Sequence, residues 1–272
     1  MIQNEDLLKI PLYFLKFSGQ HPDSDRLTFI FATTAFTILS SVILGFVFLH
    51  FVLSFGDPFL FLKNVGGFGV YVQVWGKVII GAAQKDRLAK IIKDSKHFWN
   101  ITKCPDELKN TFQMIFSTIL RLQKLFLYMT IVTITIANIQ AYLSKQLTLG
   151  IWLIEGHDIY YRFQYGIQAF TLLYVVVTQI VPMDQIFMTM CMMLIAQFML
   201  LNHKLRNLCV RDIINEEDKA RYIRNMVSYI KYHQFLLRYF KDLATTYAPV
   251  LLNEYISLIT ALCSAMITML EG

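Results

Sequence analysis

Apolar residues are concentrated in long blocks, and the longest block runs from Gly166 to Leu201. It contains one charged residue, Asp184, and one proline, Pro182. A membrane-spanning helix needs about 20 apolar residues, so this block is too long for one upright span and too short for two spans with a loop. The pattern predicts one helix that crosses a membrane, kinks at Pro182 and continues into a protein core on the water side.

Further apolar stretches fit the same pattern. The stretch from Leu27 to Gly56 holds 30 residues without a formal charge. We therefore predict an all-α, polytopic transmembrane helix bundle with five spans, at about 30–54, 65–84, 125–144, 163–185 and 250–270. Small residues near the start of the second span should let another helix approach closely. These residues are Gly66, Gly67 and Gly69.

Amphipathic helical patterns extend several spans beyond the membrane. Residues 84–99 continue the second span with apolar positions among basic ones, and Pro105 marks a helix start before the third span. After the fourth span, Asn215 and the acids at 216–218 mark another helix start. Pro249 is expected to kink that helix as it enters the fifth span. Its spacing predicts one apolar face, made of Ile223, Met226, Ile230, His233, Leu237, Phe240 and Ala244.

The segment at residues 5–18 is short and amphipathic, with leucines set against Lys9 and Lys16. Two interpretations are open at this point. The segment lies on the membrane surface, or it packs against the helix bundle.

Charge and composition support a membrane protein with a defined orientation. Only 16% of the residues are charged, whereas soluble domains carry about 25%. Lys and Arg gather in the segments between spans on one side, so the positive-inside rule predicts a cytosolic N-terminus. The cytosolic segments are then 1–26, 85–124 and 203–247, and residues 1–272 form a single domain. The net charge of +6 is explained by topology and membrane lipid head groups, without nucleic acid.

Motifs for catalysis or metal binding are not found in the sequence. It has no HExxH, GxSxG, P-loop or GxGxxG pattern, so we predict no enzyme activity and no cofactor. The four cysteines, Cys104, Cys191, Cys209 and Cys263, lack CxxC spacing and an accompanying histidine cluster. No metal site is therefore expected.

Three charged residues lie in or near the predicted spans: Lys77, Asp184 and Glu254. Such residues usually face a bundle interior or water and often carry function. For Asp184, the interpretation that we favour is a structural partner of basic residues on the cytosolic side. Lys77 is near the middle of its span, and either a functional role or snorkelling to an interface fits it. Asp184 and Gln197 are about 220° apart around a helix, so they do not form one site.

The outer halves of the spans are rich in large apolar and amphipathic side chains. A pocket lined by such residues suits a small apolar ligand held by a few polar groups. Aromatic residues that face lipid or the membrane interface would show the same periodicity, and this alternative stays open. The candidate ligand-binding residues are Tyr71, Trp75, Asn138, Phe170 and Tyr174. His203 and His233 are interpreted as polar contacts between helix extensions.

Three regions resemble the insect odorant receptor family of seven-span membrane proteins. They are LKIPLYFLKFSGQHP near the N-terminus, PMDQIFMTMCMMLIAQFMLLNHKLRNL through the fourth span, and HQFLLRYFKDLATTYAPVLLNEYISLITALC into the fifth. The resemblance covers essentially the whole chain, and order, spacing and inverted topology carry it. It implies a tuning subunit that binds volatile odorants and forms a tetrameric, ligand-gated cation channel with a shared co-receptor. The expected location is the plasma membrane of the olfactory sensory neuron dendrite.

The resemblance also assigns roles to individual residues. Odorant is expected among the outer halves of the second, third and fourth spans, and the helix extensions are expected to form an anchor where subunits meet. Asp184, Gln197 and Leu201 lie at positions that resemble those of the family. Asp184, Gln197 and His233 are the expected structural or anchor residues of this inner region. The family's last two spans have no counterpart, so the chain is expected to be incomplete. A gustatory receptor, and a five-span transporter or assembly subunit, remain as alternatives.

Overall fold

The computed structural model describes residues 6–101, 104, 106–145, 147, 151, 158–208 and 215–271. Helices make up nearly all of this part of the chain, and no strand occurs in it. Among the described residues, five stretches are long and apolar enough to cross a membrane: Arg26–Gly56, Asn64–Ala83, Leu108–Ser144, Asp158–Arg206 and Glu216–Met266. The predicted all-α, polytopic helix bundle is confirmed, and the protein is a multi-pass membrane protein. Cys209 lies outside the described residues.

The first half of the described chain contains two apolar helices and their inner extensions. Helix α1 (Asp6–Phe17) precedes α2 (Arg26–Leu53), which ends in the short 3-10 helix η1 (Ser54–Gly56). Helix α3 (Pro58–Ala83) then leads to α4 (Lys85–Asp94) and to the 3-10 helix η2 (Ser95–His97). The side chain of Asp25 caps α2 by accepting a hydrogen bond from the backbone N–H of Thr28 at 2.9 Å. This bond holds the pKa of Asp25 below its usual value.

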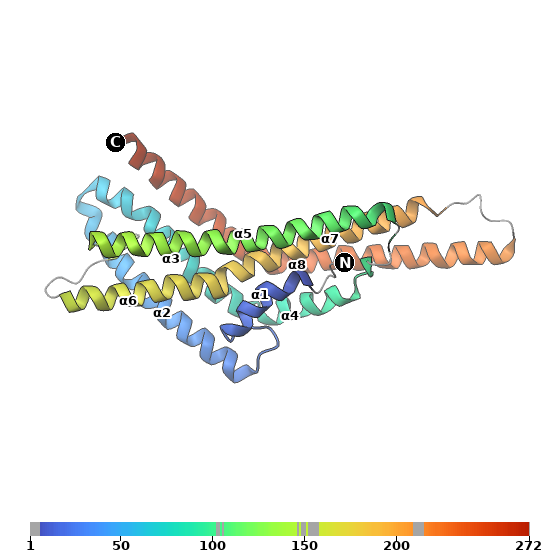
Figure 1. Cartoon of the computed structure of the whole chain (residues 1–272), viewed down its shortest axis with the longest axis horizontal. Coiled ribbons are helices and arrows are strands. Elements are labelled where there is room, and N and C mark those ends of the chain that lie inside the picture. Colours follow the sequence, from blue (N-terminus) through green and yellow to red (C-terminus); the bar gives the residue numbers. More distant parts are fainter. Residues whose placement is uncertain are drawn as a thin grey trace.

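Helices α5 to α8 run through most of the length of the molecule (Figure 1). Helix α5 (Asp106–Ser144) is continuous, so it joins an extension and the third predicted span in one rod. Helix α6 (Asp158–Val175) continues through the π-helix η5 (Val176–Ile180) into α7 (Val181–Arg206). Helix α8 (Glu216–Glu271) is the longest and contains Pro249. Figure 1 shows α8 changing direction before its C-terminal part, as a proline within a helix favours.

Two features of these helices differ from the sequence prediction. The Gly166–Leu201 block is one nearly continuous rod, but its irregularity is the π-helix η5, and Pro182 lies in the first turn of α7, where proline is tolerated. The second span does not continue unbroken into its extension. The backbone turns at Gln84, and α4 begins as a separate helix.

Close contact between α3 and α8 depends on small residues. A Cβ atom at Gly66 would lie 2.8 Å from the Ser264 hydroxyl oxygen, and one at Gly76 would lie 2.8 Å from the Asn253 amide. Asn253 in turn donates to the backbone oxygen of Gln73 at 3.0 Å. The predicted role of Gly66 in close helix approach is therefore confirmed, with α8 as the partner helix.

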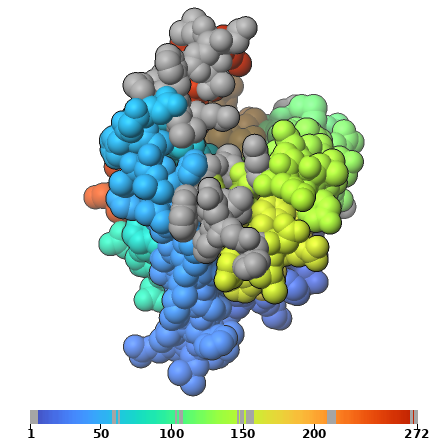
Figure 2. All heavy atoms as spheres, turned by 90° about the vertical axis from the view of Figure 1, so that its left-hand side faces the viewer, coloured from blue at the N-terminus to red at the C-terminus, as the bar shows by residue number. Residues whose placement is uncertain are grey.

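The core is divided along the bundle. The largest apolar cluster joins α1, α4, the first part of α5, α7 and α8, in the half that is predicted to be cytosolic. Helix α1 is part of it, since Leu7 and Leu15 are almost fully buried there. Two smaller clusters lie farther out, between α2, α3 and the α6–η5 segment. Figure 2, which looks at the outer end, shows α2 and the start of α3 on one side and α5 and α6 on the other.

The apolar face that the sequence predicts on α8 is mostly exposed. Ile230 is 50% and Leu237 48% exposed, and Ile223 and Phe240 are also exposed. The chain instead buries a second face of the same helix, which carries Tyr232, Leu236, Tyr239, Leu243 and Tyr247. Periodicity indicated one apolar side of α8, whereas the structure has two, and only the second packs within the chain.

Candidate functional site

The three intramembrane charges meet at one point between α3, α7 and α8. The Lys77 ammonium lies 2.9 Å from both carboxylate oxygens of Asp184 and also forms an ion pair with Glu254. Lys77 is 3% exposed, and both carboxylates are partly buried. The predicted partner of Asp184 was a basic residue of the cytosolic segments, and the structure gives Lys77 instead. Pairing allows these charges to be accommodated inside an apolar bundle.

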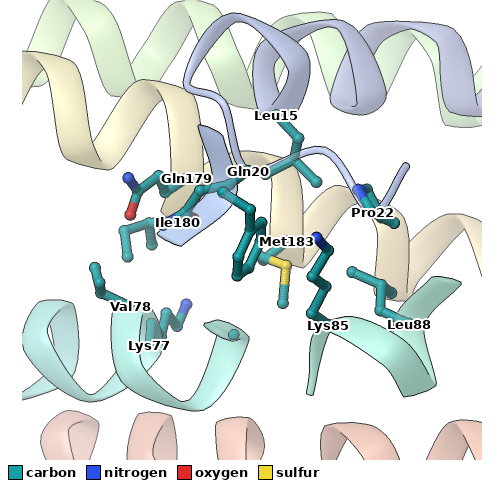
Figure 3. Close-up of a pocket in the computed structure, with 12 residues that line it drawn as sticks. Leu15, Gln20, Pro22, Lys77, Val78, Lys85, Leu88, Gln179, Ile180 and Met183 are labelled. Carbon is teal, nitrogen blue, oxygen red and sulfur yellow. The ribbon is translucent and has the colours of Figure 1, made fainter. Parts of the chain in front are cut away.

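A small cavity lies beside this ion cluster at the inner end of the spans (Figure 3). Residues of α1, α2, α3, α4, η5 and α7 line it, together with the loop after α1. They include Gln20, Lys77, Lys85, Gln179 and Met183. Its volume of about 20 Å³ has room for about one water molecule. Ligand pockets for small organic molecules are usually about 300 Å³ or larger, so this cavity is not an odorant site.

The outermost apolar cluster surrounds Tyr71. Its buried members come from α2, α3, α6 and the segment that follows α5, and they are Ile43, Val47, Tyr71, Ile151 and Leu172. Ile134 of α5 packs against this cluster. Tyr71 is 4% exposed, and its hydroxyl oxygen has no hydrogen-bond partner in the described structure. An apolar cluster with a buried polar group of this kind has the composition of a small-molecule site.

Two further polar side chains flank the same cluster without complete hydrogen bonding. Gln168 lies one turn before Leu172 on the buried face of α6, and neither end of its amide has a partner within the described residues. Asn138 lies one turn after Ile134, and its side-chain oxygen is likewise unpartnered. The backbone oxygen of Asn138 accepts from the Tyr165 hydroxyl at 3.2 Å, which fixes α5 against α6.

The other candidate ligand-binding residues lie around this cluster in different settings. The indole N–H of Trp75 donates to the Ser41 hydroxyl at 2.9 Å and so joins α3 to α2. Phe170 and Tyr174 stack at 5.2 Å between ring centroids, and Tyr174 also stacks on Phe36 at 5.4 Å. Phe170 is exposed. Tyr71 thus belongs to the cluster against which Ile134, one turn before Asn138, packs, and Tyr174 packs against the adjacent inner cluster.

Gln197 is fully buried and joins α7, α8 and the segment after η2. Its side-chain oxygen accepts from the backbone N–H of Trp99 at 3.1 Å and from the Tyr232 hydroxyl at 2.7 Å, and its amide donates to the Trp99 backbone oxygen at 3.2 Å. Trp99 and Tyr232 also stack at 3.7 Å. His233 is exposed, and its ring lies edge-on to that of Phe198 at 6.1 Å between ring centroids. Asp184, Gln197 and His233 therefore occupy three separate environments.

Another buried glutamine network was not predicted from the sequence. The Gln123 amide donates to the backbone oxygen of Leu7 at 3.0 Å and to the Thr189 hydroxyl at 2.6 Å. Gln185 donates to the backbone oxygen of Gln123 at 2.9 Å. These bonds attach α1 to α5 and α7. An uncharged polar residue at a buried position of a helix was the sequence feature that could have identified both Gln123 and Gln168.

Metal-binding groups are not assembled in the described ranges. No set of three or more His, Cys, Asp or Glu side chains there is placed to hold a metal ion. Cys191 and Cys263 form no disulfide among the described residues.

Comparison with known proteins identifies the family. The sequence model described as 7tm Odorant receptor matches residues 60–272, which is most of the chain. A comparison with curated proteins finds no match. The matched region includes the ion cluster, the residues around Tyr71 and the Gln197 network, and it belongs to a family of receptors and not of enzymes. This chain is therefore a member of the seven-transmembrane odorant receptor family.

Proposed function

We propose that this chain is the odorant-binding, tuning subunit of a ligand-gated cation channel and that it assembles with a shared co-receptor. Family membership carries the proposal. The expected setting is the plasma membrane of an olfactory sensory neuron dendrite, with the N-terminus and the helix extensions in the cytosol. The expected ligand is a small volatile molecule, and membrane lipid surrounds the apolar helices.

The cluster around Tyr71 supports an odorant-binding role. Its buried wall is apolar and contains few polar groups, which matches the chemistry of a volatile ligand with one polar atom. We place the ligand between α2, α3, α5 and α6, with Tyr71 at its centre. Trp75 and Tyr174 hold the helices next to this site together. Phe170 lies on the exposed side of α6.

The exposed apolar face of α8 supports assembly with other subunits. Ile223, Val227, Ile230, Leu237 and Phe240 are exposed at helical spacing, in a segment that is predicted to lie outside the membrane. A contiguous exposed apolar surface on the water side usually marks a contact with another protein. We propose that the co-receptor covers it, and that Gln197 and Trp99 hold α8 in position for that contact.

The experiment that tests the function is an electrophysiological one. The chain is expressed in oocytes with the co-receptor, and currents are recorded across a panel of volatile compounds. We expect odorant-evoked cation currents that exceed those of the co-receptor alone. Surface expression of both subunits without any such current would contradict the proposal.

A further inference from the structure

The hydroxyl of Tyr71 and the amide of Gln168 are deeply buried polar groups beside the outer cluster. Tyr71 is 4% and Gln168 1% exposed. The Tyr71 hydroxyl and both ends of the Gln168 amide have no hydrogen-bond partner among the described residues. Buried polar groups are nearly always hydrogen-bonded in folded proteins, because an unpaired one retains its full desolvation cost. These two groups therefore need a partner that the described part of the chain does not provide.

Other buried glutamines in the same protein show what a structural role looks like. The Gln123 amide is fully buried and donates to Leu7 and Thr189, and Gln197 is bonded at both ends to Trp99. Gln168 is equally buried but makes none of these bonds. Hydrogen bonds from their amides explain Gln123 and Gln197, although the Gln123 side-chain oxygen has no partner among the described residues. Gln179 also lacks described partners at both ends, but it lines the small inner cavity and not the outer cluster.

The two unpartnered groups are on neighbouring walls of one apolar cluster. Tyr71 of α3 and Leu172 of α6 are both buried members of it. Gln168 precedes Leu172 by one helical turn, and both belong to the buried face of α6. Residues four apart on a helix lie on the same side. The polar groups therefore flank a common apolar surface.

We propose that Tyr71 and Gln168 select ligands that carry one hydroxyl or carbonyl oxygen over hydrocarbons of the same size. The Tyr71 hydroxyl and the Gln168 amide N–H donate to the ligand oxygen, and the Gln168 side-chain oxygen accepts from a ligand hydroxyl. The alkyl part of the ligand contacts Ile43, Val47 and Leu172. This inference rests on the proposed function, because it specifies the chemistry of the same site. A site built to hydrogen-bond a polar group rejects the analogue that lacks it.

The binding test uses the chain reconstituted in lipid nanodiscs. Straight-chain alcohols, ketones and alkanes of matched carbon number compete with a bound fluorescent apolar probe. We expect the unaltered chain to prefer the oxygenated compounds. Tyr71→Phe and Gln168→Leu should each weaken binding of the oxygenated members by about three- to tenfold and leave the alkanes unchanged. Equal effects on both classes would overturn the inference, whereas no binding of any compound would overturn the proposed function itself.

Thermal stability without ligand separates a ligand-binding role from a structural one. Gln168→Leu removes an unpaired buried amide, so the melting temperature should stay the same or rise. Gln123→Leu is the matched control, since it removes a hydrogen-bonded amide from a comparable buried position. It should lower the melting temperature and keep the preference for oxygenated ligands. A loss of stability in Gln168→Leu as large as that in Gln123→Leu would overturn the inference.

Discussion

The Lys77 ammonium binds both carboxylate oxygens of Asp184 at 2.9 Å, although 107 positions separate the two residues in the sequence. Glu254 completes the cluster from α8. The ion pairs thus hold α3, α7 and α8 together at the depth where η5 gives way to α7. Lys77 is six positions from Tyr71, which is about 9 Å along α3. One helix therefore connects the proposed ligand site to the ion cluster.

Removal of the lysine should destabilise the protein strongly. Lys77→Met leaves two partly buried carboxylates without a cation, and the loss of one partner from such a cluster costs about 3 kcal/mol or more. Thermal unfolding in nanodiscs would measure this loss. The triple variant Lys77→Met, Asp184→Asn, Glu254→Gln carries no charge there and should recover much of the stability. A single variant as stable as the unaltered chain would show that the ion cluster does not hold the helices.

Gln197 should contribute far more to stability than His233. Gln197→Leu removes the acceptor for the Trp99 N–H and the Tyr232 hydroxyl and the donor to the Trp99 oxygen, at a cost of about 1–3 kcal/mol. His233→Ala is the control on an exposed surface, where substitutions usually change stability by less than about 0.5 kcal/mol. Thermal unfolding of the two variants, Gln197→Leu and His233→Ala, gives the melting temperatures to be compared. Similar values for the two variants would mean that the buried amide network is unimportant.

Helix α1 should behave as part of the core. Leu7 is fully buried against the inner cluster, so Leu7→Ala should cost about 2–5 kcal/mol in unfolding free energy. Tyr13 on the opposite side is exposed, and Tyr13→Ser should have little effect on stability. Chemical denaturation of the two variants in detergent distinguishes the possibilities. If Leu7→Ala were neutral and Tyr13→Ser reduced membrane binding, α1 would be a surface anchor instead.

The exposed face of α8 should be needed for assembly and not for folding. Ile230→Lys and Leu237→Lys place charge on side chains that make little contact within the chain. We expect both variants to fold and to reach the membrane, but to co-purify poorly with the co-receptor, because a desolvated charge at an apolar contact is costly. Lys231→Glu, at an exposed position next to this face, serves as a control. Normal co-purification of the Ile230 and Leu237 variants would place the contact elsewhere.

Sequence patterns predicted the helical class well because membrane spans depend on length and local composition. The apolar stretch at 27–56 and the block at 166–201 are both helical in the structure, as predicted. The Gly66 prediction also held, since close packing requires a small residue whatever its partner. The span boundaries and the orientation of the chain stay predictions.

Pairings between distant residues could not be predicted in the same way. Periodicity places Lys77, Asp184 and Glu254 on faces of three helices, but it does not say which faces meet, and so Asp184 was assigned the wrong partner. The break at Gln84 carries neither glycine nor proline as a signal. Helix α8 has apolar residues on two sides, and sequence spacing identified the exposed side.

Photoaffinity labelling shows directly whether the ligand binds at the cluster around Tyr71. A volatile-sized aliphatic alcohol that carries a diazirine is bound to the chain in nanodiscs, irradiated, and its adducts are mapped by mass spectrometry. We expect saturable adducts on segments 43–47, 68–75 and 167–172, which the parent alcohol competes away. Saturable adducts confined to the inner half of the bundle, at 187–200 and 229–243, would contradict it.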